Sequence, residues 1–329
     1  MSKHHQGGFV TPGAQAVDPR LSVIAGHEKA RSEQRQKRLA FLKNVAKERS
    51  SILVAYVTAN RGLISAQIAS DVIRLLRELL GPVGRVDKID LLLITRGGHT
   101  LTPLRLMSLL REFAGKVCVL VPYMAHSAGT LIALGADEIV MGAMGELGPV
   151  DPSVANQFNP VLQPEDIQGT VHPKPRPRIP ISVEDVTSYL NFAKSHATLD
   201  PAGMAQAYSA LTSQVHPLAL GNILRHHNLI RHLAKALLLM HMNAETEKEK
   251  IDSIVKKLTE ELYSHEYTIT RDEAVRLGLK VVKPTEQGEK DLWELYRLYE
   301  EFFGMDRQIN IPLELGAEKQ KYLCFDLAV

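Results

Sequence analysis

The sequence predicts an α/β protein in which buried strands alternate with amphipathic helices around a parallel sheet. Two apolar runs carry this prediction, ILVAYV at 52–57 and IDLLLI at 89–94. Such runs, without polar alternation, are typical of strands that are buried on both faces. A third run, VCVLV at 117–121, and a short one, EIVM at 138–141, follow along the chain. Helical patterns separate these strands, so right-handed crossovers and a parallel sheet are expected.

The segments between and after the strands have helical spacing. Apolar residues recur at helical intervals in 65–81 and 101–113, and a shorter helix is expected at 130–134. Residues 182–264 are predicted to be mostly helical, with a long amphipathic helix that begins after Pro217. Thr270 and Glu273 have the spacing of a capping box for a further helix. The sequence therefore predicts a helical C-terminal part after the strand-and-helix core.

The composition divides the chain into three parts. Residues 1–50 begin rich in Gly, Pro, Gln and His and continue rich in Lys and Arg, which predicts a basic, partly disordered extension with an exposed helix. Residues 51–285 hold the predicted α/β domain, and a proline-rich insert at about 165–181 contains PKPRPRIP. Residues 286–329 are expected to form a C-terminal helix and an extended tail.

The overall composition is that of an ordinary soluble globular chain. Hydrophobic residues make up 45% and charged residues 23%, and the formal net charge of +2 gives no reason to expect nucleic acid or an acidic membrane as a partner. Two cysteines, Cys118 and Cys324, do not make a disulfide framework. No apolar run approaches the roughly 20 residues that span a bilayer, and no secretory signal is recognisable. We expect a cytoplasmic protein without a membrane span.

Ser127 stands at the turn between the strand at 117–121 and the helix at 130–134. α/β enzymes place serine nucleophiles at such junctions, where the hydroxyl is exposed and the helix N-terminus offers free amides. The same position equally suits a serine that only caps the helix. From the local pattern alone, both interpretations of Ser127 stay open.

The strand at 89–94 runs into Thr95 and Arg96 and then into Gly97 and Gly98. Adjacent glycines after a strand let the backbone approach a ligand closely, with amides free to donate. The amide of Gly97 or Gly98, together with that of Ala128, is placed to form an oxyanion hole beside Ser127. A tight turn into the next helix is the alternative interpretation of the two glycines.

Three features, in this order, resemble the crotonase-like superfamily that includes Clp protease and signal peptide peptidase A. They are the strand ending in Gly97-Gly98, the strand and turn with Ser127, and the T-x-x-E-A-x-x-x-G-L segment at 270–279. The segments MAHSAGTLIALGADEIVMG, ELGPVDP and VHPLALGN are similar to the branch named serine dehydrogenase proteinase. The resemblance covers about residues 50–285.

The resemblance implies a crotonase-like ββα-spiral core and oligomers that are built by helices packing between subunits. It also implies a serine peptidase that acts on peptides or unfolded protein without a cofactor. In that enzyme Ser127 is the nucleophile, and the amides of Gly97 or Gly98 and of Ala128 hold the oxyanion.

The general base is where the sequence departs from its relatives. The place of the Clp protease histidine falls near Asp151, and an aspartate of ordinary pKa, about 4, is a poor acceptor of a serine proton. The place of the lysine in shorter relatives of signal peptide peptidase A falls near Arg231, which stays protonated. Lys235, one turn on, and His227, on the apolar arc of that helix, are equal candidates, whereas His126 is constrained by its place beside the serine.

Two other functions are compatible with the expected fold. Without a clear base, the chain would be a catalytically silent oligomeric scaffold or peptide-binding protein. Crotonase chemistry on an acyl-thioester is the second alternative, although no acidic pair is placed to shuttle protons. The sequence contains neither a G-x-x-x-x-G-K-[ST] loop nor a G-x-G-x-x-G turn after a strand, and its histidines lack zinc-peptidase spacing. We therefore expect no nucleotide cofactor and no metal.

Overall fold

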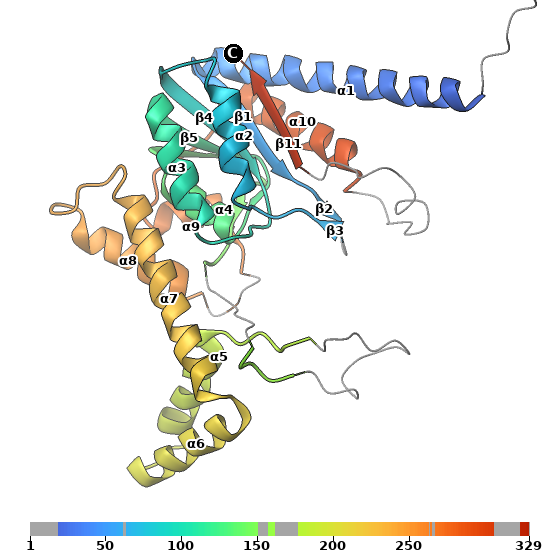
Figure 1. Cartoon of the computed structure of the whole chain (residues 1–329). Coiled ribbons are helices and arrows are strands. Elements are labelled where there is room, and N and C mark those ends of the chain that lie inside the picture. The colour runs from blue at the N-terminus through green and yellow to red at the C-terminus, as the bar shows by residue number, and fades with distance from the viewer. Residues whose placement is uncertain are drawn as a thin grey trace, which may run out of the picture.

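The computed structural model describes residues 19–61, 64–150, 157–161, 177–262, 264, 267–305 and 323–328. Figure 1 shows a sheet with helices on both faces and a helical arm that extends away from it. Within the described residues the main sheet has six strands, and all neighbouring pairs are parallel except β1 with β11. In sheet order the strands are β10 (Val281–Val282), β7 (Glu138–Met141), β5 (Ala114–Val121), β4 (Val86–Ile94), β1 (Ile52–Thr58) and β11 (Leu323–Ala328).

The apolar runs form central strands because both faces of the sheet are covered. Along β4, Leu91 and Leu93 enter one core cluster, while Leu92 and Ile94 enter the cluster on the opposite face. All four side chains are at most 2% exposed. This burial on both faces explains why the strands lack polar alternation, and the predicted α/β fold with a parallel sheet is confirmed.

The first face of the sheet is covered by helices from the middle and the late part of the chain. Their apolar stripes share one core cluster with β1, β4, β5 and β7. These helices are α2 (Asp71–Leu80), α3 (Thr102–Phe113), α4 (Ala128–Leu134), α7 (Pro217–Leu238), α8 (Lys248–Glu260) and α9 (Arg271–Arg276).

The opposite face is covered by the first and last helices, α1 (Pro19–Arg49) and α10 (Glu286–Phe303). The basic helix was expected to be exposed, but Leu42, Val45 and Ala46 of α1 are buried in the same cluster as Leu295 and Tyr299 of α10. These few apolar positions lie at helical spacing near the end of a long polar segment, so they are easily overlooked in its composition. Two helices that lie outside residues 51–285, α1 and α10, thus contribute to the core.

A buried ion-pair network closes the amino ends of the strands. Arg49, the last residue of α1, donates from Nε to Asp90 Oδ2 at 2.6 Å, and its Nη2 lies 3.2 Å from Glu138 Oε1. Ser51 donates to the same Asp90 oxygen at 2.7 Å, and Lys116 lies 3.4 Å from Glu138 Oε2. The Asp90 side chain has no exposed surface, so this network holds α1 to β4 and β7 in a place where unpaired charge would be costly.

Short strands extend the core toward the carboxyl ends of the main strands. β6 (Met124–Ala125) pairs in parallel with β8 (Glu146–Leu147), which pairs antiparallel with β9 (Ile269–Thr270). A second pair is formed by β2 (Asn60–Arg61) and β3 (Ile64–Ser65). The three-stranded sheet therefore joins the turn before Ser127 to the T-x-x-E segment that lies far along the sequence.

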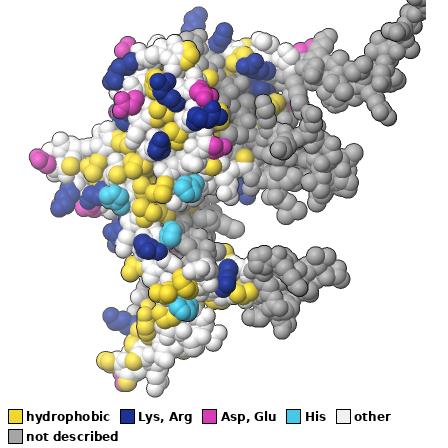
Figure 2. All heavy atoms as spheres, in the orientation of Figure 1, with side chains coloured by type: hydrophobic (Ala, Val, Ile, Leu, Met, Phe, Trp, Pro, Cys, Tyr) yellow, Lys and Arg dark blue, Asp and Glu magenta, His cyan; other side chains and the backbone are white. Residues whose placement is uncertain are grey.

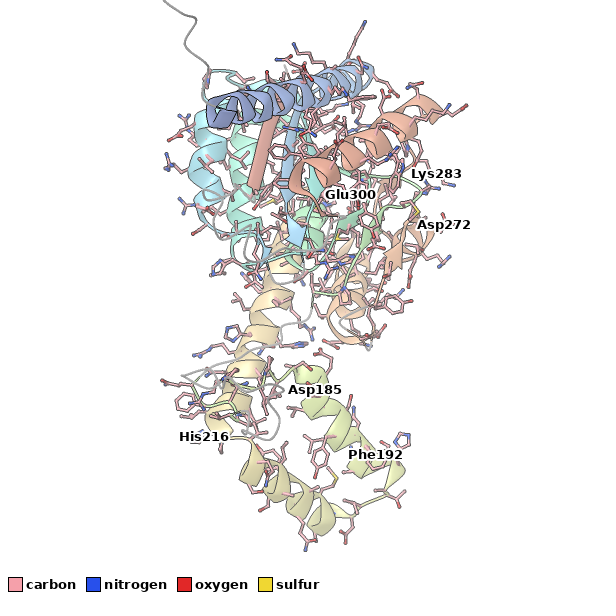
Figure 3. All side chains as sticks on the ribbon, turned by 90° about the vertical axis from the view of Figure 1, so that its right-hand side faces the viewer. Asp185, Phe192, His216, Asp272, Lys283 and Glu300 are labelled. Carbon is pink, nitrogen blue, oxygen red and sulfur yellow. The ribbon has the colours of Figure 1, made fainter. Side chains whose placement is uncertain are left out.

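The arm consists of α5 (Val183–Asn191), a π-helical turn η2 (Phe192–His196), α6 (Pro201–Gln214) and the first part of α7. Its small core contains Ile181, Val215, Ala219 and Ile223. α6 has no buried residue and no charged residue. Figure 2 shows hydrophobic side chains on the surface of the arm, and Figure 3 places Phe192 on it, apart from the sheet.

Two features near the end of the chain can be compared with the sequence expectations, and the capping box is the one that differs. Thr270 precedes α9 without a side-chain capping bond. The Glu273 carboxylate, which would complete the capping box, accepts a hydrogen bond from the Tyr267 hydroxyl at 2.8 Å. Residues 323–328 of the predicted extended tail form β11, which pairs antiparallel with β1 of the same chain. The first half of PKPRPRIP, residues 173–176, lies outside the described residues, and the division of the chain into three parts stays a prediction.

Candidate active site

Ser127 occupies a strained position at the start of α4. Its backbone has φ 51° and ψ −112°, and the amide of Gly129 donates to the carbonyl of His126 at 2.8 Å across it. This is the first central position of a type II′ turn, which normally takes glycine. The serine side chain makes no capping bond to the helix. No hydrogen bond therefore supports the interpretation of Ser127 as a helix cap, and its hydroxyl is not used to cap α4.

Two other non-glycine residues in the described ranges, Ser50 and Thr198, also have positive φ. Ser50 directly follows α1 and Thr198 lies two residues after η2, at helix ends where left-handed residues are common. Ser127 instead precedes its helix. Strain of this kind costs on the order of 1–3 kcal/mol and persists mainly at functional sites.

Gly97 and Gly98 lie directly against the serine turn. Their φ angles are 111° and 149°, a region of backbone conformation that residues other than glycine rarely adopt. A Cβ atom on Gly97 would lie 2.8 Å from the Ser127 Cβ and 3.2 Å from the Ala128 amide nitrogen, and one on Gly98 would lie 2.4 Å from the backbone of Ile68. Only glycine permits this approach, so the two turns predicted from sequence are brought together.

The amides at this junction differ in their partners. The Gly97 amide donates to Thr95 Oγ1 at 3.0 Å. Within the part of the chain that the structure describes, no hydrogen bond takes the amide of Gly98 or that of Ala128. Of the three residues predicted for an oxyanion hole, Gly98 and Ala128 thus offer donors, while Gly97 supplies the close approach.

Thr95 links the two turns and is a residue that the sequence did not single out. It is 1% exposed, and its hydroxyl accepts from Thr58 Oγ1 at 2.9 Å as well as from the Gly97 amide. Its own amide donates to the Met124 carbonyl at 2.9 Å, and its carbonyl accepts from the His126 amide at 3.1 Å. A threonine two residues before Gly-Gly is a weak signal in sequence, because Thr58, Met124 and His126 come from other segments of the chain.

The two predicted base candidates lie on α7 and have partners on α8. His227 is 6% exposed, and its Nε2 lies 3.6 Å from Glu260 Oε1. Lys235 is about half exposed and donates to Asp252 Oδ1 at 2.7 Å. Among the described residues, no recorded contact joins either side chain to Ser127.

The remaining positions that the sequence considered are also accounted for. His126 Nε2 lies 3.0 Å from Glu146 Oε1, on β8. Arg231 forms an ion pair with Glu260. Asp151 lies outside the described residues. Within the described ranges, no group of three His, Cys, Asp or Glu side chains is arranged to hold a metal ion.

The residues that form this site lie in a region that matches a known protein family. Residues 23–164 match the model of the ClpP-like SDH-type serine proteinases. The family resemblance seen in the sequence is thereby confirmed. The matched residues run from α1 past β8, so they include Gly97, Gly98 and Ser127 and stop before the arm.

Two uncharacterized proteins of Methanocaldococcus jannaschii are also similar to the chain. One is 26% identical over 271 residues, which cover 79% of this chain and 78% of that protein. The other is 31% identical over 128 residues, which cover 36% of this chain and 42% of that protein.

Two solved structures resemble the chain at low similarity. Both are of a membrane-bound stomatin-specific protease, 1510-N: a serine-to-alanine mutant, and a lysine-to-alanine mutant in complex with a substrate peptide. Each has 16% sequence identity and a TM-score of 0.38. The first covers 72% of this chain and 83% of its own, and the second 71% and 77%.

Proposed function

We propose that this protein is a serine peptidase in which Ser127 is the nucleophile. The observation that carries the proposal is the strained backbone of Ser127, at φ 51° and ψ −112°, in a turn position where glycine would be unstrained. A side chain is retained at such a position when its hydroxyl is needed there. The match to a serine proteinase family over the same residues supports the assignment.

The oxyanion hole in this proposal is formed by the amides of Gly98 and Ala128. Both are unbonded among the described residues, and Ala128 N is the first amide of α4, where the helix offers partial positive charge. Preorganised donors of this kind favour the charge that develops in the transition state. The hydrogen bond from Gly97 to Thr95 holds the glycine turn in place.

The proposed reaction is acyl transfer to serine. Ser127 Oγ bonds to the peptide carbonyl carbon as its proton passes to the base, and the oxygen of the tetrahedral intermediate accepts from the two amides. Collapse of that intermediate breaks the C–N bond, and the amine leaves with the proton. Water then attacks the ester and releases the acid and the free serine.

We propose Lys235 and His227 as the two candidates for the base. Each would have to exchange its present partner on α8 for the serine hydroxyl. Lys235→Ala and His227→Ala separate the two, because the true base variant loses serine reactivity and the other retains it. Wild-type reactivity of the serine in both variants would exclude both residues as the base.

Labelling with a fluorophosphonate tests the nucleophile. The serine oxygen displaces fluoride from phosphorus, and mass spectrometry maps the adduct. We expect one adduct, on Ser127, that is absent in Ser127→Ala and unchanged in Ser108→Ala, a control at an exposed serine that bonds only to its own helix. A folded sample without any adduct would contradict an activated serine and favour a catalytically silent scaffold.

The substrates we propose are peptides or unfolded protein segments, and the compartment is the cytoplasm. No cofactor has a part in the proposed chemistry. No helix within the described ranges is long and apolar enough to cross a membrane.

We also propose that the arm mediates homo-oligomer formation. Its exposed side chains include Phe192 at 61% and Tyr208 at 51%, on a segment with little core of its own. Large apolar groups gathered on one protruding element are typical of an interface. Tyr208→Asp should lower the mass measured by light scattering, whereas Val275→Asp on α9, at a comparable 53% exposure, should not.

A further inference from the structure

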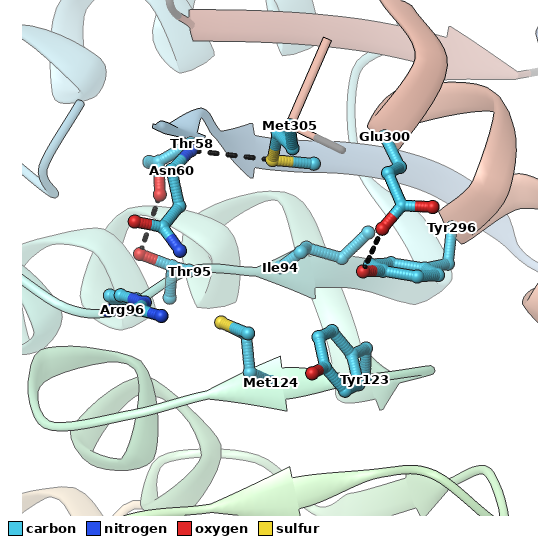
Figure 4. A pocket seen from close by; sticks show the side chains of 10 residues that line it. All are labelled: Thr58, Asn60, Ile94, Thr95, Arg96, Tyr123, Met124, Tyr296, Glu300 and Met305. Atoms are coloured by element: carbon cyan, nitrogen blue, oxygen red, sulfur yellow. Dashed lines mark hydrogen bonds between the residues drawn. The ribbon is translucent and has the colours of Figure 1, made fainter. Parts of the chain in front are cut away.

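A cavity of about 200 Å³ lies at the carboxyl ends of β1 and β4. Its wall contains Thr95 and Arg96, directly before Gly97, and Tyr123 and Met124, from the turn that leads to Ser127. α10 closes the opposite side, as Figure 4 shows. The cavity is therefore built on the same two chain segments as the proposed catalytic turn.

Arg96 gives the cavity one charged end. With the side-chain oxygen of Asn60 turned toward it, that oxygen accepts from Arg96 Nε at 2.6 Å and from Nη2 at 3.1 Å. Among the described residues, no carboxylate forms an ion pair with Arg96. One edge of the guanidinium is thus held in place, and the remaining N–H groups are available to a carboxylate, which a guanidinium binds through paired hydrogen bonds.

Two tyrosines and a glutamate form the other side. The rings of Tyr123 and Tyr296 lie 4.7 Å apart, and the Tyr296 hydroxyl donates to Glu300 Oε1 at 2.7 Å. Burial, together with this bond to Glu300, raises the pKa of Tyr296, so the hydroxyl keeps its proton at neutral pH. Figure 4 shows Arg96 and Glu300 at opposite ends of the cavity. Glu300 would repel a second anionic group, so a ligand with one carboxylate and an apolar or aromatic body fits best.

We propose that this cavity binds a single carboxylate through Arg96 and the adjoining apolar or aromatic group between Tyr123 and Tyr296. The volume is below the roughly 300–1,000 Å³ of sites for drug-sized ligands, so it accommodates about one residue of a peptide. The carboxylate is that of a peptide C-terminus or of an acidic side chain. The choice of a peptide rests on the proposed peptidase function, whereas the preference for a carboxylate rests on Arg96.

Trp293 makes the cavity directly observable. It is the one tryptophan of the chain, and its ring stacks on Tyr296 at 5.0 Å and lies edge-on to Tyr123 at 6.5 Å. Ser127→Ala protein is titrated with 3-phenylpropanoate and, separately, with 3-phenylpropanamide. Trp293 fluorescence and calorimetry report the binding, and neither readout requires catalysis.

We expect the acid to bind about tenfold more tightly than the amide, a ratio typical of one charged hydrogen-bonded contact. Arg96→Gln should abolish this ratio, and Arg105→Gln, at an exposed arginine on α3, should preserve it. Equal affinity for acid and amide, an unchanged ratio in Arg96→Gln, or no binding at millimolar concentration would overturn the proposal. Because the nucleophile is already absent, none of these results depends on whether Ser127 is activated.

Tripeptides then identify the source of the carboxylate. Alanyl-alanyl-phenylalanine is compared with its C-terminal amide and with the amide of alanyl-glutamyl-phenylalanine. Loss of Arg96-dependent binding in both amides assigns the site to a peptide C-terminus. If, of the two amides, only the glutamyl peptide keeps its Arg96-dependent binding, the site is assigned to an acidic side chain. Binding of all three with equal affinity would contradict the carboxylate site.

Discussion

The two ends of the main sheet differ in how completely their polar groups are paired. At the amino ends, Arg49 and Asp90 are paired within a network that leaves the aspartate fully buried. At the carboxyl ends, Arg96 has no carboxylate partner among the described residues, the Gly98 amide is unbonded there, and Ser127 has a strained backbone. Both ends contain an arginine, but within the described residues only Arg49, at the amino ends, is paired with carboxylates.

We propose that this difference separates a structural end of the sheet from a functional one. A buried charge that is fully paired fixes the packing of neighbouring elements, and removing its partner is costly. Unpaired donors and strain lower stability, so they are retained where a ligand or a reaction uses them. The match to a serine proteinase family over both ends of the sheet is consistent with such a division of labour.

The largest expected effect is at the amino end. Asp90→Ala would leave the Arg49 guanidinium, 18% exposed, without its main partner, and should lower the free energy of unfolding by about 3–5 kcal/mol. Arg96→Gln, at the other end, should change it by no more than about 0.5 kcal/mol. Urea denaturation of both variants measures the contrast, and similar losses in the two would break the comparison.

A smaller loss is expected at Thr95, which joins the glycine turn to the serine turn. Thr95→Val keeps the shape but leaves the Gly97 amide and the Thr58 hydroxyl without an acceptor, which should cost about 2 kcal/mol. Fluorophosphonate labelling of Ser127 should also slow, because the turn at Gly97 and Gly98, which forms part of the proposed oxyanion hole, is less well held. Thr95→Ser retains the hydroxyl and serves as control. A valine variant with wild-type labelling would show that Thr95 supports the fold alone.

Ser127 offers a prediction in the opposite direction. Ser127→Gly should raise the free energy of unfolding by about 1 kcal/mol, because glycine adopts φ 51° without strain, and it should abolish labelling. Ser127→Ala should abolish labelling while retaining the strain. Thermal or chemical denaturation of the pair distinguishes them. Equal stability in the two variants would contradict the assignment of strain to this residue.

The smallest expected effect is a pH dependence of the folding stability that arises from His241, next to the end of α4. Burial lowers the pKa of His241, whose Nε2 lies 2.9 Å from the Leu134 carbonyl at the end of α4. The unfolded chain therefore binds the proton first as the pH falls below about 6.5, and folding stability falls with it. His241→Gln keeps a donor for Leu134 and should flatten this part of the profile between pH 7.5 and 5.5. An identical profile in the variant would exclude His241 as the cause.

The sequence predicted the layered core well, because its signals are local. Runs such as IDLLLI must be covered on both faces, and the helix that starts after Pro217 follows from its apolar spacing and the proline. Glycine at 97 and 98 and serine at 127 likewise stand out in their own segments. A strand, a turn and a helix can each be recognised within about a dozen residues.

What the sequence could not predict depends on partners from distant segments. The Gly97 amide is taken by Thr95, whose hydroxyl is placed by Thr58 on another strand. The cavity beside Arg96 is closed by α10, about two hundred residues further along the chain. Spacing within one segment carries no information on such contacts, because tertiary packing decides them.

The most direct test of the central claim is a crystal structure of the fluorophosphonate adduct. If the unpaired donors at the carboxyl end serve the chemistry of Ser127, phosphorus is bonded to Ser127 Oγ. Its non-bridging oxygen then lies about 2.7–3.1 Å from the amide nitrogens of Gly98 and Ala128, while Gly97 keeps its bond to Thr95. An adduct whose oxygen points away from both amides, or a probe bonded to another residue, would contradict the account.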